Sequence, residues 1–230
     1  MVNDMDIIHS FTECGSGYPL ILLHGNGESK EYFQNQIEPF SKHFNVIALD
    51  TRGHGASPRG TAEFSISQFA EDLKYFLDKR GTEKAHILGF SDGGNIALTF
   101  ALKYPDMVDK LVLNGANLFP GGVKTSVQLP VVIGYWAASV ISLFDKKALS
   151  KKELLGLMVN EPDIAPEQLS KLDMPVMVIA GKNDMIKERH TRLIAASIKN
   201  SRLCIIEGDH FIAAKESECF NREVIDFLKE

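Results

Sequence analysis

The chain has 230 residues with a formal net charge of −5, and 44% of the residues are hydrophobic. This composition is typical of one globular domain, and without a Lys/Arg stripe nucleic acid is not an expected partner. The cysteines Cys14, Cys204 and Cys219 show no metal-binding spacing and favour a reducing compartment. We expect a cytoplasmic protein, because MVNDMDIIHS does not have the apolar run of a signal peptide.

Short apolar runs alternate with amphipathic helical patterns along most of the chain. In chain order, the apolar runs are PLILLHG, NVIALD, AHILGF, VDKLVLNGA, PVMVIAG and RLCIIE. Apolar spacing predicts a helix after Ser65, which can cap it together with Gln68. A second helix is expected from about Asp92 to Tyr104, where Pro105 ends it. This alternation indicates an α/β fold, a mostly parallel sheet with helices on both faces, whose ligands bind at the carboxyl ends of the strands.

Residues 117–172 interrupt this alternation. The interval is too long for a loop and apolar enough to pack over another surface, so we expect an inserted lid. Residues 1–116 and 173–230 then form the α/β core domain. Within the insertion, residues 127–144 have no charge and approach the length of a membrane span, but Pro130 and Gly134 interrupt them. We therefore expect a buried or lid helix and no membrane span.

The sequence GFSDGG follows the apolar run AHILGF and precedes a predicted helix. Gly89 to Gly93 fit G-x-S-x-G, a pattern that places a serine on a sharp turn between a strand and a helix. Glycines at the two outer positions remove the collisions that side chains would make in such a turn. The pattern predicts that Ser91 is an exposed nucleophile, whereas in a glycine-rich turn of structural origin the serine would be incidental.

A serine nucleophile needs a base, and the base needs a carboxylate that orients it. His210 follows the last predicted strand, in GDHF, and Asp184 follows PVMVIAG, in GKNDMI. We predict the triad Ser91, Asp184 and His210, each at the carboxyl end of a strand. The weaker alternatives are His190 as base and Asp209 or Asp173 as acid. The remaining histidines considered as bases are expected to be structural: His9, His43 and His86.

A tetrahedral intermediate also needs backbone N–H donors for its oxyanion. The N–H of Asp92, in the first turn of its helix, can supply one donor. The loop His24-Gly25-Asn26-Gly27 follows PLILL, and the N–H of Asn26 can supply the other. We expect His24 to organise this loop and to transfer no proton.

Together these motifs resemble those of the α/β-hydrolase superfamily over nearly the whole chain. HGNG, DTRGHGAS, GFSDGG, GKNDMI and GDHF follow that family's order. GFSDGG, the sequence NGAN at residues 114–117 and the small lid are also similar to valacyclovir-hydrolase-like enzymes. The resemblance implies a serine hydrolase without cofactor or metal, and a loop in which Asp50, Arg52 and His54 hydrogen-bond internally. The N-terminus has room for one antiparallel strand, MDIIHSFTECG, so we expect about seven strands.

The expected reaction is hydrolysis of a small carboxylic ester through an acyl-enzyme; an amino-acid ester, a thioester or a lactone would fit. Carbon–carbon bond hydrolases use the same triad and remain an alternative. A non-catalytic ligand-binding protein on this fold would usually lack a triad member, and a dinucleotide site is disfavoured because GSGYPL precedes a strand.

Two substrate contacts are also expected. Asp92 either suits the positive end of its helix and bonds locally, or faces the pocket and binds a substrate ammonium group, as the valacyclovir-hydrolase resemblance suggests. The lid should cover the site with an apolar face drawn from Leu129, Val132, Ile133, Trp136 and Phe144, of which Trp136 is the predicted substrate contact. The oligomeric state does not follow from the sequence.

Overall fold

The computed structural model describes residues 6–230. Its strands are β1 (Phe11–Cys14), β2 (Pro19–Leu23), β3 (Asn45–Leu49), β4 (Ala85–Phe90), β5 (Val108–Asn114), β6 (Val176–Gly181) and β7 (Ser201–Ile206). They form one sheet in the order β1-β3-β2-β4-β5-β6-β7, in which β1 alone runs antiparallel, to β3. The predicted mostly parallel sheet of about seven strands is confirmed, and MDIIHSFTECG contributes the one antiparallel strand.

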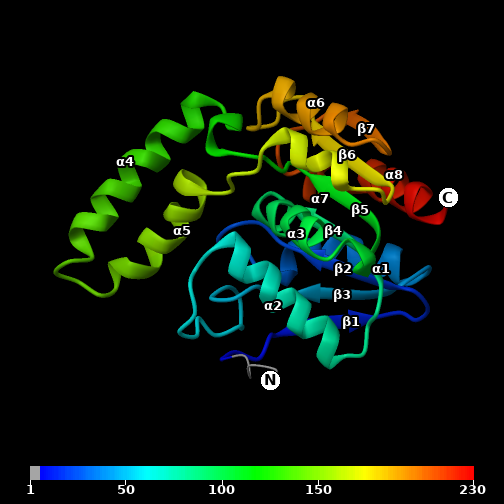
Figure 1. Ribbon diagram of the computed structural model, residues 1–230, viewed down its shortest axis with the longest axis horizontal. Coiled ribbons are helices and arrows are strands. Elements are labelled where there is room, and N and C mark those ends of the chain that lie inside the picture. The colour runs from blue at the N-terminus through cyan, green and yellow to red at the C-terminus, as the bar shows by residue number, and fades with distance from the viewer. Residues whose placement is uncertain (1–5) are drawn as a thin grey trace.

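Helices cover both faces of the sheet (Figure 1). They are α1 (Gln34–Ser41), α2 (Ile66–Lys79), α3 (Asp92–Lys103), α4 (Thr125–Ile141), α5 (Ala148–Asn160), α6 (Glu188–Ser197), α7 (Ile212–Lys215) and α8 (Ser217–Lys229). Helices α2, α3 and α6 pack against one face, and α1, α7 and α8 against the other. The predicted start of α2 is confirmed, since the Ser65 hydroxyl accepts a hydrogen bond from the N–H of Gln68.

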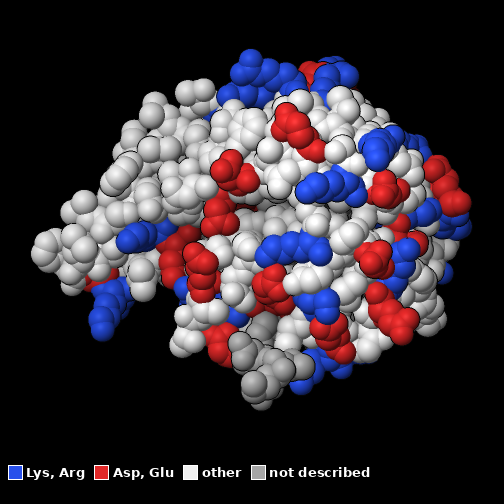
Figure 2. Space-filling model, in the orientation of Figure 1, with Lys and Arg blue, Asp and Glu red and all other residues white. Residues whose placement is uncertain are grey.

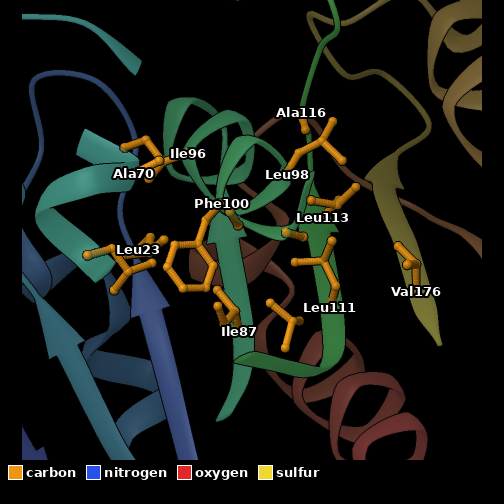
Figure 3. Packing of buried hydrophobic residues seen from close by; sticks show 14 of the residues in the cluster. Leu23, Ala70, Ile87, Ile96, Leu98, Phe100, Leu111, Leu113, Ala116 and Val176 are labelled. Atoms are coloured by element: carbon orange, nitrogen blue, oxygen red, sulfur yellow. The ribbon is translucent and has the colours of Figure 1, made fainter. Parts of the chain in front are cut away.

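The alternation of side chains along each strand divides the core into two layers. In β2, Ile21 and Leu23 join the layer under α3, whereas Leu20 and Leu22 join the layer under α8. Figure 3 shows the first layer, where Phe100 of α3 reaches down between β2 and β4. Because apolar residues fill both faces, the central strands are continuous apolar runs, and the sheet holds the strand ends rigidly.

The insertion between β5 and β6 consists of two parts. Helices α4 and α5 form an antiparallel hairpin, residues 124–160, that projects from the body (Figure 1). The return segment behaves differently, because Leu169 in the short helix Pro166–Lys171 is fully buried in the core and packs near α6. Within the part of the chain that the structure describes, no helix has both the length and the apolar character needed to cross a membrane.

The loop DTRGHGAS after β3 is buried, but its bonds are not all internal. Asp50 accepts from the N–H of Ala56, within the loop, as the resemblance implied. The fully buried Arg52 instead reaches out of the loop, donating to Asp72 of α2 through Nε and Nη2 at 2.7 and 2.8 Å. It also donates to Asp6 at 2.8 Å. The prediction for Arg52 was therefore wrong: a buried guanidinium needs carboxylate partners, and Asp50, the carboxylate of the loop itself, is paired with Lys30.

Candidate active site

Ser91 occupies a turn between β4 and α3 that only a few residue combinations allow. Its backbone has φ 54° and ψ −120°, which is strained for a residue with a side chain. A Cβ at Gly89 would lie 2.1 Å from the carbonyl oxygen of Gly93, and one at Gly93 would lie 2.1 Å from that of Leu23. The two glycines of the G-x-S-x-G pattern are thus sterically required, and they allow the serine to stand at the carboxyl end of the sheet.

The structure brings Ser91, His210 and Asp184 together from three strand ends. His210 Nε2 lies 3.0 Å from Ser91 Oγ, and His210 Nδ1 lies 2.7 Å from Asp184 Oδ1. The same carboxyl oxygen of Asp184 accepts from the N–H of Ile186 at 2.8 Å. Because a carboxylate only accepts, Nδ1 carries the imidazole proton and leaves Nε2 free to take a proton from the hydroxyl. This geometry can activate Ser91 as a nucleophile.

The alternative bases and acids lie elsewhere. His190 accepts from the N–H of Leu118 at 2.9 Å, and burial lowers its pKa to about 4, which leaves it a neutral structural acceptor. His24 organises the loop as expected, accepting from the N–H of Thr51 at 3.1 Å. Asp173 is exposed and Asp209 is partly exposed, and they pair with Lys199 and Lys215.

Asp92 is buried beside the nucleophile. Its Oδ1 accepts from Asn95 Nδ2 at 3.0 Å, and Asn95 in turn binds Asn117. Its Oδ2 is buried and has no hydrogen-bond partner among the described residues. Burial raises the pKa of this carboxyl to about 6, although the bond from Asn95 opposes the shift. Asp92 therefore keeps one acceptor oxygen unsatisfied next to Ser91.

A small cavity of about 30 Å³ opens beside Ser91. Asn26 and Asp92, the two predicted oxyanion-hole residues, both line it, as does Glu161. The remaining lining residues are Asn117, Val123, Met158, Met185 and Ile186. Two acidic residues therefore line this space and no lysine or arginine does, so its electrostatics suit a cation better than an anion.

Comparison with known proteins places this geometry in a family. A family model described as the alpha/beta hydrolase fold matches residues 18–158, which is more than half of the chain. The chain belongs to the α/β-hydrolase family. The predicted superfamily and the prediction of an enzyme are thereby confirmed, and the hydrolase class is that of its relatives.

Individual relatives of this family cover nearly the whole chain. A 2-hydroxy-6-oxononadienedioate/2-hydroxy-6-oxononatrienedioate hydrolase of Pseudomonas putida is 29% identical over 98% of this chain and 93% of its own. The enol-lactonase of Burkholderia xenovorans has the same fold at a TM-score of 0.81 and 18% identity, covering 96% of both chains. A meta-cleavage product hydrolase of Pseudomonas fluorescens aligns at a TM-score of 0.77 and 23% identity, over 97% of this chain and 94% of that one.

Three polar contacts join the hairpin region of this family member to the body, and one of them involves a residue of the site. Asn26 Nδ2 donates to the carbonyl of Leu154 in α5 at 2.7 Å. Arg59, in the loop after β3, donates to Glu153 of α5, with a shortest distance of 2.7 Å. Glu161, directly after α5, accepts from the N–H of Ile66 at the start of α2, at 2.6 Å. The loop that carries Asn26 is therefore coupled to the position of α5.

The structure does not bring Trp136 to the site. Its side chain is 64% exposed on α4, and it is not among the residues that line the cavity. Leu129, Ile133 and Phe144 are also exposed. The physical reason is that α4 packs on α5, and α5 and the residue after it supply the cavity wall through Met158 and Glu161. The expected apolar cover from α4 is therefore corrected to a mixed wall from α5.

The sequence reasoning missed Glu161 and Met158. No spacing motif marks either residue, and Glu161 is separated from Ser91 by 70 positions. The one usable signal was that both lie in the last third of the predicted insertion, on its way back toward the core. Asn117 had a clearer signal, since it ends the sequence NGAN that was already noted.

Proposed function

We propose that the protein hydrolyses a small carboxylic ester through an acyl-enzyme on Ser91. Ser91 Oγ attacks the ester carbonyl while His210 Nε2 takes its proton, and Asp184 holds the imidazole and stabilises its charged form. His210 then returns the proton to the departing alcohol. A water, activated by the same imidazole, attacks the acyl carbon and releases the acid. The continuous bonding from Ser91 through His210 to Asp184, at 3.0 and 2.7 Å, carries this proposal.

The oxyanion of each tetrahedral intermediate would be held by the N–H groups of Asn26 and Asp92. Asp92 is the first residue of α3, and N–H groups in the first turn of a helix have no partner within the helix. Asn26 lines the same cavity, and the bond from its side chain to Leu154 keeps its backbone in place. Preorganised donors of this kind are worth about 3–4 kcal/mol of transition-state stabilisation each.

The substrate class follows from the two carboxyl groups in the wall. A carboxylate about 6 Å from a developing oxyanion would oppose it by roughly 3 kcal/mol at an effective dielectric constant of 20. A substrate ammonium group between Asp92 and Glu161 would offset this repulsion, and it would satisfy the unpaired Oδ2 of Asp92. We therefore propose amino-acid esters as the preferred substrates, in agreement with the valacyclovir-hydrolase resemblance.

Carbon–carbon bond hydrolysis is the second candidate, because the relative from Pseudomonas putida is named for a dienedioate substrate. A dioate carries two negative charges at neutral pH, and cationic side chains would be expected to bind them. The cavity beside Ser91 instead presents Asp92 and Glu161. Charge repulsion thus favours the amino ester over the dioate.

A variant of the nucleophile tests the mechanism. Ser91→Ala should lower turnover on the best ester by about 10⁴- to 10⁶-fold, as the loss of a triad member does in serine hydrolases. Its melting temperature should stay close to that of the parent. A fluorophosphonate probe should label Ser91 of the parent and no residue of the variant. Turnover that survives in Ser91→Ala would overturn the assignment.

The substrate class is tested by Asp92→Asn on a matched pair of esters, one with an α-amino group and one without. We expect kcat/KM to fall about 10- to 100-fold on the amino ester alone, since a hydrogen bond to a charged group contributes about 1.5–3 kcal/mol. Asp106→Asn, which removes an exposed acid just beyond the far end of α3, is the control. An equal loss on both esters would contradict an ammonium site, and a dienedioate hydrolysed faster than either ester would favour the second candidate.

A further inference from the structure

The outer face of α4 carries large apolar side chains that nothing else in the described chain covers. Leu129, Ile133, Trp136 and Val140 of α4, and Leu143 in the turn directly after it, have exposed fractions between 57% and 76%, and Ile141 and Phe144 beside them are exposed as well. We call the first five of these residues the α4 stripe. In Figure 2 the hairpin is mostly white, with charged residues along its lower edge, whereas both signs of charge are scattered over the body. An exposed apolar area of this size on a helix indicates an interaction surface.

The positions of the α4 stripe follow a regular spacing. Successive members are 4, 3, 4 and 3 residues apart, which is the spacing of the apolar seam along which two helices pair. Residues 125–144 contain no charged residue, so the positions that flank the seam cannot repel an identical partner. Because α4 is apolar on every side, it is the exposure of these five side chains together, and not the spacing alone, that marks this face as the one left without a partner.

We propose that the α4 stripe pairs with the α4 stripe of a second copy of this chain. The α4–α5 hairpin is half of a four-helix bundle, and a twofold axis across the stripe would complete it. The hairpin projects from the body (Figure 1), which leaves its outer face open to a second hairpin. Pairing of the two stripes places each apolar side chain against the other copy.

The area is sufficient for a stable pair. Along α4, from Leu129 to Val140, the stripe spans about 17 Å at 1.5 Å of rise per residue, and Leu143 extends it into the following turn. Five large side chains from each copy, burying roughly 100–150 Å² apiece, cover about 1,000–1,500 Å² in total, which reaches the range of specific interfaces. A dimer with this interface would be of moderate affinity, and its population would depend on protein concentration.

A lipid surface fits the stripe less well than a second copy does. Helices that lie on membranes carry lysine or arginine along the polar face that flanks the apolar one. The basic residues nearest to the stripe, Lys124 and Lys146, lie beyond its two ends. The opposite face of α4 is packed on α5 and presents no charge of its own.

Dimerisation would act on the active site through α5. The carbonyl of Leu154 in α5 accepts from Asn26, and Met158 lines the cavity beside Ser91. A second copy that holds α4 also restrains α5, because the two helices pack together along their lengths. We therefore expect specific activity to rise with protein concentration over the range in which the dimer forms.

The proposal is tested by measuring the mass of the protein in solution and the environment of Trp136 over the same range of concentration. Sedimentation of the full chain from low to high micromolar concentration should show a change from one copy to two. Trp136, the sole tryptophan, should shift its emission to the blue over the same range as it leaves water. Ile133→Lys and, separately, Val140→Lys should weaken the dimer at least tenfold without lowering the melting temperature, because both side chains are exposed in one copy.

Leu193→Lys, an exposed apolar position on α6, is the matched control and should dimerise as the parent does. A chain that stays monomeric at every concentration with unchanged Trp136 emission would overturn the proposal. The proposal would also be overturned if Ile133→Lys and Val140→Lys both dimerised as strongly as the parent. A blue shift of Trp136 on phosphatidylglycerol vesicles, in a chain that sediments as one copy without them, would replace the second copy by a membrane surface.

Discussion

Strand β4 and helix α4 are both strongly apolar, yet their burial is opposite. All six residues of β4 are buried, whereas Ala138 is the one buried residue of the seventeen in α4. The strand is covered by helices on both faces, whereas α4 packs mainly on α5 within the described residues. Apolar composition thus determines how much surface must leave water, while topology decides which of these surfaces are covered within one chain.

The same contrast runs through the active site. Ser91, Asp184 and His210 stand at the ends of strands that the core fixes, while Met158 and Glu161 come from the end of the hairpin. The strand ends rest on the whole core, whereas the hairpin is joined to the body by the buried Leu157 and a few polar contacts. Substitutions in the core and at the hairpin should therefore change the free energy of unfolding by different amounts.

The largest effect is expected in the core, at Arg52. Its side chain is fully buried with Asp72, which is 2% exposed. Arg52→Gln would leave that carboxylate without a cation, and the free energy of unfolding should fall by about 3–5 kcal/mol. Urea denaturation measures it. Replacing the pair together, with Arg52→Met and Asp72→Leu, should restore much of the loss. If Arg52→Gln were as stable as the parent, the loop that carries Arg52 would contribute no more to the free energy of unfolding than the hairpin contacts do.

At Asp92, which lies between the core and the hairpin, a substitution should raise the stability at neutral pH instead of lowering it. Its folded pKa of about 6 lies above the usual 3.8, so folding favours the protonated form. Stability is therefore lost as pH rises from about 4 to about 6, by about 3 kcal/mol in all at 1.36 kcal/mol per pKa unit. Asp92→Asn should be more stable than the parent at pH 7, and the difference should vanish below pH 4, as measured by melting at each pH. A difference independent of pH would contradict a buried charge.

The smallest effect is expected at the polar contact that holds the hairpin. Arg59 and Glu153 are 35% and 20% exposed, and exposed ion pairs contribute about 0.2–1 kcal/mol. A double-mutant cycle with Arg59→Gln and Glu153→Gln should give a coupling of that size in urea, and it should shrink in high salt. Each single substitution should also raise KM, because α5 forms part of the cavity wall. Expressed as a free energy, this effect on KM should exceed the change in the free energy of unfolding. A coupling as large as that of Arg52 with Asp72 would make the hairpin as fixed as the core.

Much of the fold and the triad could be predicted from local patterns. A buried parallel strand must be a continuous apolar run, and this pattern predicted β4. A nucleophile on a sharp turn needs glycines around it, and Gly89 and Gly93 therefore predicted the position of Ser91. His210 and Asp184 followed from strand ends, because all parallel strands end at the same edge. The predicted triad and oxyanion-hole roles remain proposals that the geometry supports.

The orientation of α4 could not be predicted. Its apolar residues lie on every side, so periodicity did not show which side faces the cavity, and Trp136 was assigned to the wrong one. The partners of Arg52 were equally hidden, because Asp72 is 20 positions away and Asp6 lies 46 positions before it. Contacts of this kind depend on how separate elements pack, which no local spacing encodes.

The hairpin leaves and re-enters the body at neighbouring points, since the N–H of Ile164 donates to the carbonyl of Leu118 at 2.8 Å. A segment with joined ends can grow, shrink or be exchanged while the sheet stays as it is, because the entropy of closing a loop rises only with the logarithm of its length. If the proposed roles of Met158, Glu161 and the α4 stripe hold, one contiguous stretch of the sequence would carry part of the cavity wall together with the partner surface. Exchanging that stretch among homologues would then alter both properties without touching the triad.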